Sequence, residues 1–371
     1  MNKDKLHILF LCGWYPSRVL PTNGDFIQRH AEAVSIIHKV SVLHIISDPD
    51  LKQKIEINSQ NINGVSTHIA YLKPTTNKFI KAVRYFTAFK KLLKHVGPFD
   101  MVHLNILYPF GIFSLFLKFF YKKPFIITEH RHHYQYPMNK NLGFIERYIS
   151  KKVSKNACVN APVTKHLGKH MQNFGLKGTY KSIPNVVDTE LFKPKSKASS
   201  HLVFIHVSGL NDEIKNITGI LNTLDRLKKH TTDFAFYFIG GKNKFGKSYE
   251  SDDNIVFIDH IQQNELVNYL QKSDLFVLFS NYENLPCVIL EAFSCGVPVV
   301  STDVGGIKEY FPENFGKLIN VNDEDELLNV MLNFKNFQWA DKQEMHKYVE
   351  DNFSKAAVAK NYAKLYQSCL N

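Results

Sequence analysis

The segment 274–311 constrains the fold most, because strand and helix patterns alternate along it. Its apolar run 275–279 is typical of a strand that is buried on both faces. A polar loop follows, and Pro286 suits the first position of a helix, where its missing N–H costs nothing. Gly296 is the expected end of that helix, and 297–302 has the pattern of a second strand. The segment therefore predicts a strand–helix–strand unit of a parallel sheet.

Two loops of this segment contain the residues with functional chemistry. One contains Glu283 and the other contains Gly305-Gly306, and each loop follows a predicted strand. Ligands of parallel sheets bind at the carboxyl ends of the strands, and a helix N-terminus there favours an anion such as a phosphate. Glu291 lies about two turns beyond Glu283, inside an otherwise apolar helix, where an unpaired charge is costly to bury. Its expected partner is a ribose diol or a cation.

These residues together resemble the donor site of the retaining family 4 glycosyltransferases, which have the GT-B fold. Two glutamates at this spacing also occur on solvated helix faces, so the pair alone is a weak indication. The order of the turn, the Gly-Val-Pro-Val-Val strand entry and the paired glycines favours the family. The residues that match it are Glu283, Asn284, Leu285, Pro286, Glu291, Gly305 and Gly306.

The resemblance implies an α/β fold with two Rossmann-like, doubly wound domains that face each other across a cleft. It places an acceptor-side domain at 1–193, a donor-binding domain at 194–352 and a C-terminal helix that crosses back at 353–371. A length of 371 residues also favours two domains over one core. The implied reaction transfers a sugar from a nucleotide-diphosphate sugar with retention at the anomeric carbon. It implies no metal and no cofactor besides the donor.

The resemblance also assigns roles to donor-side residues. Glu291 is expected to accept the ribose hydroxyls, Glu283 to contact the donor sugar, and Ile261 to lie where the backbone meets the nucleobase. Backbone N–H groups at the helix starts 284–287 and 305–307 are expected to stabilise the leaving diphosphate.

Lys215 is the expected cation at that diphosphate. It follows the strand predicted at 202–207 and can act on phosphate oxygens as a point charge. Most lysines are simply exposed, so this role depends on the family pattern. The family has an arginine before this lysine, but Ser208 or Gly209 occupies its position here. The arginine's phosphate contact is therefore missing or supplied from elsewhere.

The first half of the chain supplies the remaining candidates. A long loop after the first strand contains Asn23-Gly24, a turn signal. A plain surface loop would look similar, but the resemblance places Asn23 and Gly24 in the family's glycine-bearing loop near the acceptor and the donor phosphates. His130 follows the strand 125–128, where the family has a histidine close to the donor sugar. The histidines near it lack the spacing of a metal site, and Asp48-Pro49-Asp50 is expected to form a turn.

Short apolar runs predict the strands of the sheets. In the first half these runs are 6–12, 39–46, 101–104, 125–128 and 156–160. In the second half they are 202–207, 234–239, 255–259, 275–279 and 297–302. Their alternation with helical patterns is typical of parallel α/β domains.

The net charge of +12 is compatible with nucleic acid, an anionic membrane or a phosphorylated ligand. No nucleic-acid-binding motif is present, so a nucleic-acid partner is not expected. The basic segment 77–96 predicts a helix with a solvated face, and the alternative is attachment to an anionic membrane surface. Its apolar face is expected to contain Phe86, Phe89, Leu93 and Val96.

The five cysteines include no Cys-x-x-Cys pair, and the N-terminus has no signal-peptide pattern. Together these features favour a cytoplasmic protein, with peripheral attachment to the inner face of the membrane as an option. The basic, Phe-rich first half suggests a glycan or lipid-linked acceptor and a role in cell-surface polysaccharide synthesis. A catalytically silent GT-B protein that binds a nucleotide or partner, and a nucleotide-sugar epimerase, are the alternatives.

Overall fold

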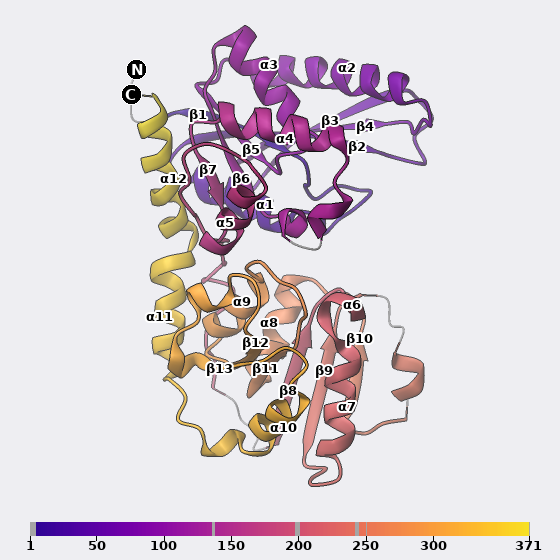
Figure 1. Cartoon of the computed structure of the whole chain (residues 1–371), viewed down its shortest axis with the longest axis vertical. Coiled ribbons are helices and arrows are strands. Elements are labelled where there is room, and N and C mark those ends of the chain that lie inside the picture. The colour runs from indigo at the N-terminus through magenta and orange to yellow at the C-terminus, as the bar shows by residue number, and fades with distance from the viewer. Residues whose placement is uncertain (1–4, 136–137, 197–200, 242–244, 250, 371) are drawn as a thin grey trace. The chain divides into compact units, whose positions relative to one another are not determined.

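The computed structural model describes residues 5–135, 138–196, 201–241, 245–249 and 251–370. The chain divides into two compact units (Figure 1). Unit 1 comprises Met1–Val186 and Lys355–Asn371, and unit 2 comprises Val187–Ser354. The C-terminal helix therefore belongs to unit 1, although the whole of unit 2 precedes it in the chain.

The described part of unit 1 forms a seven-stranded sheet in the order β3-β4-β2-β1-β5-β6-β7. All neighbouring strands pair in parallel except β3 and β4, which form an antiparallel hairpin. The strands are β1 (His7–Cys12), β2 (Lys39–Ser47), β3 (Ile55–Ile62), β4 (Val65–Leu72), β5 (Met101–Asn105), β6 (Phe125–Glu129) and β7 (Asn160–Pro162). Their burial on both faces explains the continuous apolar runs of β1 and β6.

The helices of unit 1 fall on opposite faces of this sheet. The chain crosses in one direction from β1 to β2 and in the other from β4 through β7, and right-handed crossovers place the helices of the two directions on opposite faces. One face has α1 (Asp25–Ser35), against which the C-terminal α12 (Lys355–Leu370) packs. The other face has α2 (Lys78–Val96), α3 (Gly111–Tyr121) and α4 (Phe144–Asn156), and the short α5 (Lys165–Asn173) follows β7.

Unit 2 contains a parallel sheet in the order β10-β9-β8-β11-β12-β13. Its strands are β8 (Leu202–Val207), β9 (Phe234–Ile239), β10 (Ile255–Ile258), β11 (Leu275–Leu278), β12 (Val299–Thr302) and β13 (Gly316–Ile319). The helices are α6 (Asp212–Lys215), α7 (Ile217–Leu227), α8 (Gln263–Lys272), α9 (Cys287–Ser294), α10 (Glu324–Leu332) and α11 (Lys342–Phe353). Its core is rich in phenylalanine, including Phe204, Phe234, Phe236 and Phe238.

Most predicted strands are confirmed with small shifts at their ends. The strand predicted at 156–160 is wrong, because Asn156 is the last residue of α4 and β7 begins only at Asn160. The sequence interpretation also missed the β3–β4 hairpin and α4. Asp48-Pro49-Asp50 is the predicted turn, in which the Asp48 carboxylate accepts a hydrogen bond of 3.0 Å from the Asp50 N–H.

Three local predictions need correction. Phe86 and Leu93 are not in the buried face of α2, which consists of Ala88, Phe89, Leu92 and Val96. Pro286 is the N-cap of α9 and not its first residue. The helix expected near Ile307 is one 3₁₀ turn, Ile307–Tyr310. Among the residues that the structure describes, no helix combines the length and apolar character needed to cross a bilayer.

Candidate functional site

The strand order of unit 2 reverses next to β8. The chain runs outward from β8 through β9 to β10, then returns to β11 on the other side of β8. The loops after β8 and β11 therefore leave the sheet in opposite directions, which opens a crevice at the carboxyl ends of these two strands. Lys215 follows β8 and Glu283 follows β11, so the topology brings these two predicted residues to one crevice.

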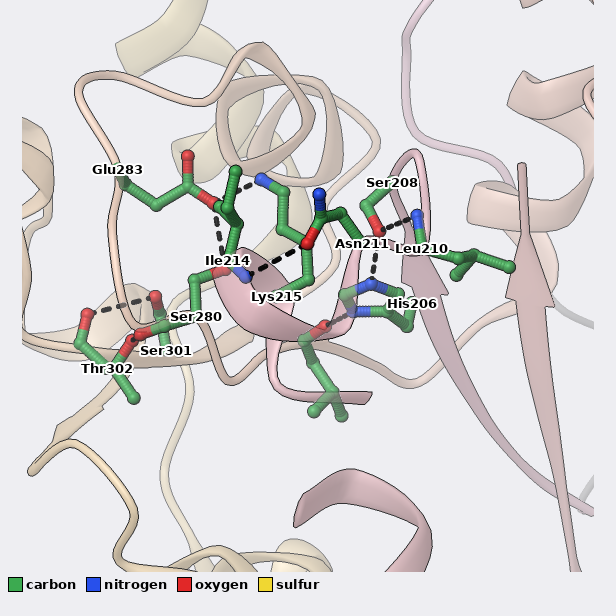
Figure 2. A network of polar contacts seen from close by, with 11 residues as sticks. His206, Ser208, Leu210, Asn211, Ile214, Lys215, Ser280, Glu283, Ser301 and Thr302 are labelled. Atoms are coloured by element: carbon green, nitrogen blue, oxygen red, sulfur yellow. Dashed lines mark hydrogen bonds and ion pairs between the residues drawn. The ribbon is translucent and has the colours of Figure 1, made fainter. Parts of the chain in front are cut away.

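The side chains of Lys215 and Glu283 meet there as an ion pair (Figure 2). Both are largely shielded from solvent, with 19% of the Lys215 side chain and 9% of the Glu283 side chain exposed. The Ser280 hydroxyl also donates to the Glu283 carboxylate, at 2.8 Å. Removing one member of such a shielded pair leaves the other charge without its partner, which is costly.

Hydrogen bonds fix both loops that hold this pair. The Thr302 hydroxyl at the end of β12 donates to the Ser280 carbonyl at 2.6 Å. The Asn281 N–H donates to the Ile214 carbonyl at 2.8 Å and so ties the Glu283 loop to α6. The Asn211 side chain caps α6 by accepting from the Ile214 N–H. The carboxylate and the ammonium are therefore held by three neighbouring strand ends.

His206 organises the start of the Lys215 loop, and the sequence interpretation missed it. Burial lowers the pKa of His206 to about 3, so its ring is neutral. Nδ1 lies 2.8 Å from the Val277 carbonyl, which can only accept, so Nδ1 holds the proton. Nε2 then accepts from the Ser208 hydroxyl at 2.7 Å, and that oxygen accepts from the Leu210 N–H at 3.0 Å. The histidine thus joins β8 to β11 below the crevice. A single imidazole inside the apolar run 202–207 was the available signal.

This chain of hydrogen bonds shows what occupies the expected arginine position. Ser208 uses its hydroxyl to order the loop, and Gly209 is exposed, with no atom within 4 Å of a Cβ added there. Neither residue supplies a cation. The positive charge of this loop that faces Glu283 comes from Lys215.

Gly305 packs closely against the backbone of the Glu283 loop. Its φ is +63°, and a Cβ at this position would lie 2.1 Å from the Glu283 carbonyl oxygen. The next residue, Gly306, donates its N–H to the Asn284 carbonyl at 2.9 Å. Ile307 uses its N–H for the Val304 carbonyl. Two of the N–H groups expected to face a diphosphate at 305–307 are thus already used within the chain, which corrects that part of the prediction.

The other donor-side candidates lie in the same unit. Glu291 is buried within α9 at 3% exposure. Burial and, to a smaller extent, the charge of Glu291 raise the pKa of the Cys295 thiol. Leu285 is buried and Pro286 half-buried at the start of α9, directly after Glu283 and Asn284. Ile261 is half-buried in the connection between β10 and α8.

The first-half candidates lie in unit 1. Gly24 is the N-cap of α1 with φ +78°, and a Cβ there would lie 2.7 Å from the Trp14 backbone carbon. Glycine is therefore required for the loop to fold on itself. The preceding Asn23 donates its N–H to the Leu20 carbonyl at 3.3 Å. The loop is compact and begins after β1, beside the point where the strand order of unit 1 reverses between β1 and β5.

His130 directly follows β6 and is buried against α1. Its ring centroid lies 4.6 Å from that of Phe26 and 5.2 Å from that of His30. Burial lowers the pKa of His130 to about 3. The adjacent Glu129 is fully buried, and its carboxylate accepts hydrogen bonds of 2.9 Å from the N–H groups of Leu107, His130 and Arg131. A neutral imidazole on a loop fixed by this carboxylate can donate one hydrogen bond and accept another.

Within the described part of the chain, no group of three or more histidine, cysteine, aspartate or glutamate side chains is placed to hold a metal ion. The site that the geometry assembles is a lysine and a glutamate that meet at the carboxyl ends of β8 and β11 in unit 2. Such a site can bind an anion next to a polar, neutral group.

Family comparisons match both halves of the chain. The model described as Glycosyl transferases group 1 matches residues 187–352, and the model for Glycosyltransferase Family 4 matches residues 35–191. Together they include Glu283, Glu291 and Lys215 in one match and His130 in the other. Gly24 lies outside both matches.

Two curated bacterial relatives have names that refer to a gene region or to polysaccharide biosynthesis. An uncharacterized 41.2 kDa protein in the cps region of Klebsiella pneumoniae is 24% identical over 301 residues, which are 76% of this chain and 82% of that protein. The Vi polysaccharide biosynthesis protein VipC/TviE of Salmonella typhi is 30% identical over 109 residues. That match covers 28% of this chain and only 19% of the Salmonella protein.

Solved structures share the fold over nearly the whole chain. Sucrose-phosphate synthase from Thermosynechococcus elongatus has a TM-score of 0.77 at 16% identity, covering 98% of this chain and 99% of that one. Anabaena HepE in complex with UDP-glucose has a TM-score of 0.70 at 14% identity, covering 98% and 100%. At these identities the likeness establishes the fold, which is two α/β domains of the GT-B type.

Proposed function

Because the chain belongs to glycosyltransferase family 4, we propose that it transfers a sugar from a nucleotide-diphosphate sugar to a glycan or lipid-linked acceptor. The observation that supports this most directly is the Lys215–Glu283 pair at the crevice of unit 2. Parallel sheets bind ligands at such a crevice, and a shielded ammonium there is suited to the charge of a diphosphate.

In the proposed reaction, Lys215 stabilises the leaving diphosphate. The bond between the anomeric carbon and the diphosphate oxygen breaks, and a bond from the acceptor hydroxyl oxygen to that carbon forms on the same face. The acceptor proton passes to the departing diphosphate oxygen. Lys215 neutralises the charge that develops on the diphosphate, which lowers the barrier by electrostatic stabilisation. Retention at the anomeric carbon and independence from metal ions are parts of this proposal.

The remaining residues bind and orient the two substrates. Glu291 accepts the ribose hydroxyls, Glu283 contacts the donor sugar, and Ile261 lies at the nucleobase. His130 contributes a neutral imidazole, because its lowered pKa keeps the ring uncharged at neutral pH. Gly24 and Asn23 shape the acceptor-side loop. UDP-glucose is the first donor to test, because HepE binds it in its crystal structure. The names of the Klebsiella and Salmonella relatives suggest a surface polysaccharide as the product.

Donor binding is tested by the thermal shift of the full chain with UDP-, GDP- and ADP-glucose. A donor at about a hundredfold over its Kd adds about 2.7 kcal/mol to stability. We expect one nucleotide to raise the melting temperature, and we expect Lys215→Met and Glu291→Gln to reduce that rise. Lys229→Met is the matched control, because this exposed lysine of unit 2 follows the C-terminal end of α7, at the edge of the sheet opposite to the candidate site.

Turnover then separates an enzyme from a binding protein. Sugar transfer to a glycan primer, with the anomeric configuration of the product assigned by NMR, is the expected outcome. An α-linked product from an α-linked donor supports retention, and a β-linked product contradicts it. Donor binding with no hydrolysis or transfer would favour the catalytically silent alternative, for which the absence of a cation at Ser208 and Gly209 is the specific observation.

A further inference from the structure

Three neighbouring helices of unit 1 expose an unusual share of its large apolar side chains. Among the described residues, seventeen large hydrophobic side chains are exposed, and eleven of them lie on α2, α3 and α4: four, four and three, respectively. The most exposed are Phe144 at 82%, Phe79 at 77% and Phe120 at 75%. Large exposed apolar surfaces of this kind mark interaction sites.

The three helices cover the same face of the sheet, and α3 contacts both of the others (Figure 1). Rings from α2 and α3 stack at 4.2 Å between the centroids of Phe89 and Phe113. On the outer side, the Phe86 and Phe116 centroids are 5.4 Å apart. α3 packs on α4 so closely that a Cβ at Gly111 would lie 2.8 Å from Val153. We use the name three-helix surface for the outward sides of these helices.

Lysines continue the apolar stripes of this surface. On α2, Phe79, Val83 and Phe86 repeat at helical spacing and are exposed. Lys90 and Lys94 extend the same stripe, and the Lys90 ammonium lies 4.8 Å from the Phe86 ring centroid. An apolar first half is thus followed by a basic second half on one side of the helix.

The exposed side of α4 repeats this arrangement. Phe144 and Tyr148 are followed by Lys152 and Lys155 at helical spacing. The Lys152 ammonium lies 5.7 Å from the Tyr148 ring centroid. The sequences of α2 and α3 contain no aspartate or glutamate. The single glutamate of α4, Glu146, is paired with Arg131 at 3.0 Å. The three-helix surface is therefore both apolar and uniformly positive.

We propose that the three-helix surface docks unit 1 on an anionic lipid bilayer. Phenylalanine, isoleucine and tyrosine side chains enter the region between headgroups and acyl chains, while the lysine ammonium groups remain at the lipid phosphates. Each basic residue near such a surface is attracted by the negative potential of the leaflet. Charge complementarity thus favours an anionic bilayer as the partner of this surface. The only acidic side chain of the three helices, Glu146, is already paired with Arg131.

Two other occupants fit these side chains less well. A second copy of this chain would bring two positive surfaces together, which is unfavourable. Single-stranded nucleic acid would use the lysines and stack on the aromatic rings. It would leave the exposed aliphatic side chains Ile80, Val83 and Ile112 without a function. A bilayer uses both kinds of group.

The parts of this surface on α2 and α4 that are richest in exposed apolar side chains adjoin the edge of unit 1 that carries His130. α2 and α4 each begin after a strand at the carboxyl edge of the sheet, so their apolar first halves lie toward that edge. A docked bilayer would therefore lie close to the acceptor-side loops. The inference goes beyond sugar transfer and does not depend on it, because it concerns a separate surface.

Flotation of the full chain with lipid vesicles tests the proposal. Vesicles of phosphatidylcholine containing about 30% phosphatidylglycerol are compared with pure phosphatidylcholine, at about 0.05 M and about 0.5 M salt. We expect binding to the anionic vesicles alone, and weaker binding at high salt. The triple variant Phe79→Ser, Phe120→Ser, Phe144→Ser should lose at least about tenfold in partitioning, because each ring buries apolar area in the bilayer.

Charge variants complete the experiment. Lys90→Gln with Lys94→Gln should weaken binding to anionic vesicles several-fold, since two lipid-facing charges are lost. The matched control Lys229→Gln with Lys335→Gln removes two exposed lysines of unit 2 and should bind like the wild type. No binding to anionic vesicles, or unchanged binding of the folded triple variant, would overturn the proposal. So would binding to a single-stranded oligonucleotide, or a dimer that the triple variant dissociates, in place of vesicle binding.

Discussion

The Tyr366 hydroxyl in α12 lies 2.8 Å from Nδ1 of His103 in β5, although 263 residues separate the two in the chain. The other ring nitrogen of His103 lies 2.7 Å from the Thr128 hydroxyl in β6. Tyr362, one turn before Tyr366, places its hydroxyl 2.9 Å from Thr128 and 2.9 Å from Nδ1 of His30. The C-terminal helix is thus fixed to the sheet and to α1 by a buried polar network, beyond its apolar packing.

Tyr366→Phe tests this network. The substitution removes the partner of a fully buried histidine nitrogen and keeps the ring, so we expect a loss of about 1–3 kcal/mol in the free energy of unfolding of unit 1. Urea unfolding measures the free energy of unfolding, and limited proteolysis measures how readily α12 is cleaved. Tyr121→Phe, at an exposed position of α3, is the control and should be neutral. Equal stability of both variants would mean that the hydrogen bond to His103 contributes nothing.

The Lys215–Glu283 pair is tested by a double-mutant cycle on donor binding. Lys215→Met should weaken donor binding strongly, because it removes the cation and leaves the shielded Glu283 carboxylate without its partner. Glu283→Gln should affect kcat more than Kd if the carboxylate acts at the donor sugar. Calorimetry and initial rates measure both quantities. A coupling free energy near zero between the two substitutions would show that the pair does not act as a unit.

Gly305→Ala should weaken donor binding without unfolding the chain. The φ of +63° is strained for alanine, and the new Cβ would clash with the Glu283 carbonyl, so the Glu283 loop must shift. We expect a local cost of about 1–3 kcal/mol and a reduced affinity for the donor. Gly143→Ala is the matched control, because its φ is −67° and no atom lies within 4 Å of a Cβ there. Thermal shift with and without donor distinguishes the two variants.

Buried neutral histidines predict a loss of stability in mild acid. The folded pKa of His206 is about 3, below the 6.5 of an exposed histidine, so the unfolded chain binds more protons between these values. Stability is therefore complete above about pH 6.5 and falls as the pH is lowered, by about 2 kcal/mol for this residue at about pH 5. His44, with a folded pKa of about 4, acts in the same direction.

His206→Gln isolates this contribution. Glutamine can donate to the Val277 carbonyl and accept from the Ser208 hydroxyl, but it does not titrate. We expect the variant to be less stable than the wild type near neutral pH and the difference to shrink as the pH falls toward about 5. Melting temperatures across this range provide the measurement. Parallel curves for the two proteins would contradict the assignment of His206 as a buried, neutral residue.

Hydrophobic periodicity and turn residues in the sequence were sufficient to predict the parallel α/β architecture. Apolar runs such as 202–207 and 234–239 match β8 and β9 at both ends, because strands buried on both faces need continuous apolar side chains. Gly296 was identified as a helix stop from its type, and it has φ +70°. The β3–β4 hairpin escaped prediction because the exposed strand β3 has polar residues where buried strands have apolar ones.

The composition of the candidate crevice could be predicted, but its internal contacts could not. The sequence placed Lys215 and Glu283 in separate loops with separate roles. Only the tertiary structure pairs them, because the strand order puts β8 beside β11 although β9 and β10 intervene in the chain.

Local sequence determined where most strands and turns of this protein lie, because secondary-structure propensity and the periodicity of burial depend on a few neighbouring residues. Tertiary structure alone decided which N–H groups at 305–307 donate hydrogen bonds within the chain and which histidines are buried and neutral. It also decided that the Tyr366 hydroxyl contacts His103. These features depend on contacts between segments far apart in the chain. Such contacts are selected by the packing of the whole unit and leave no periodic trace in the sequence.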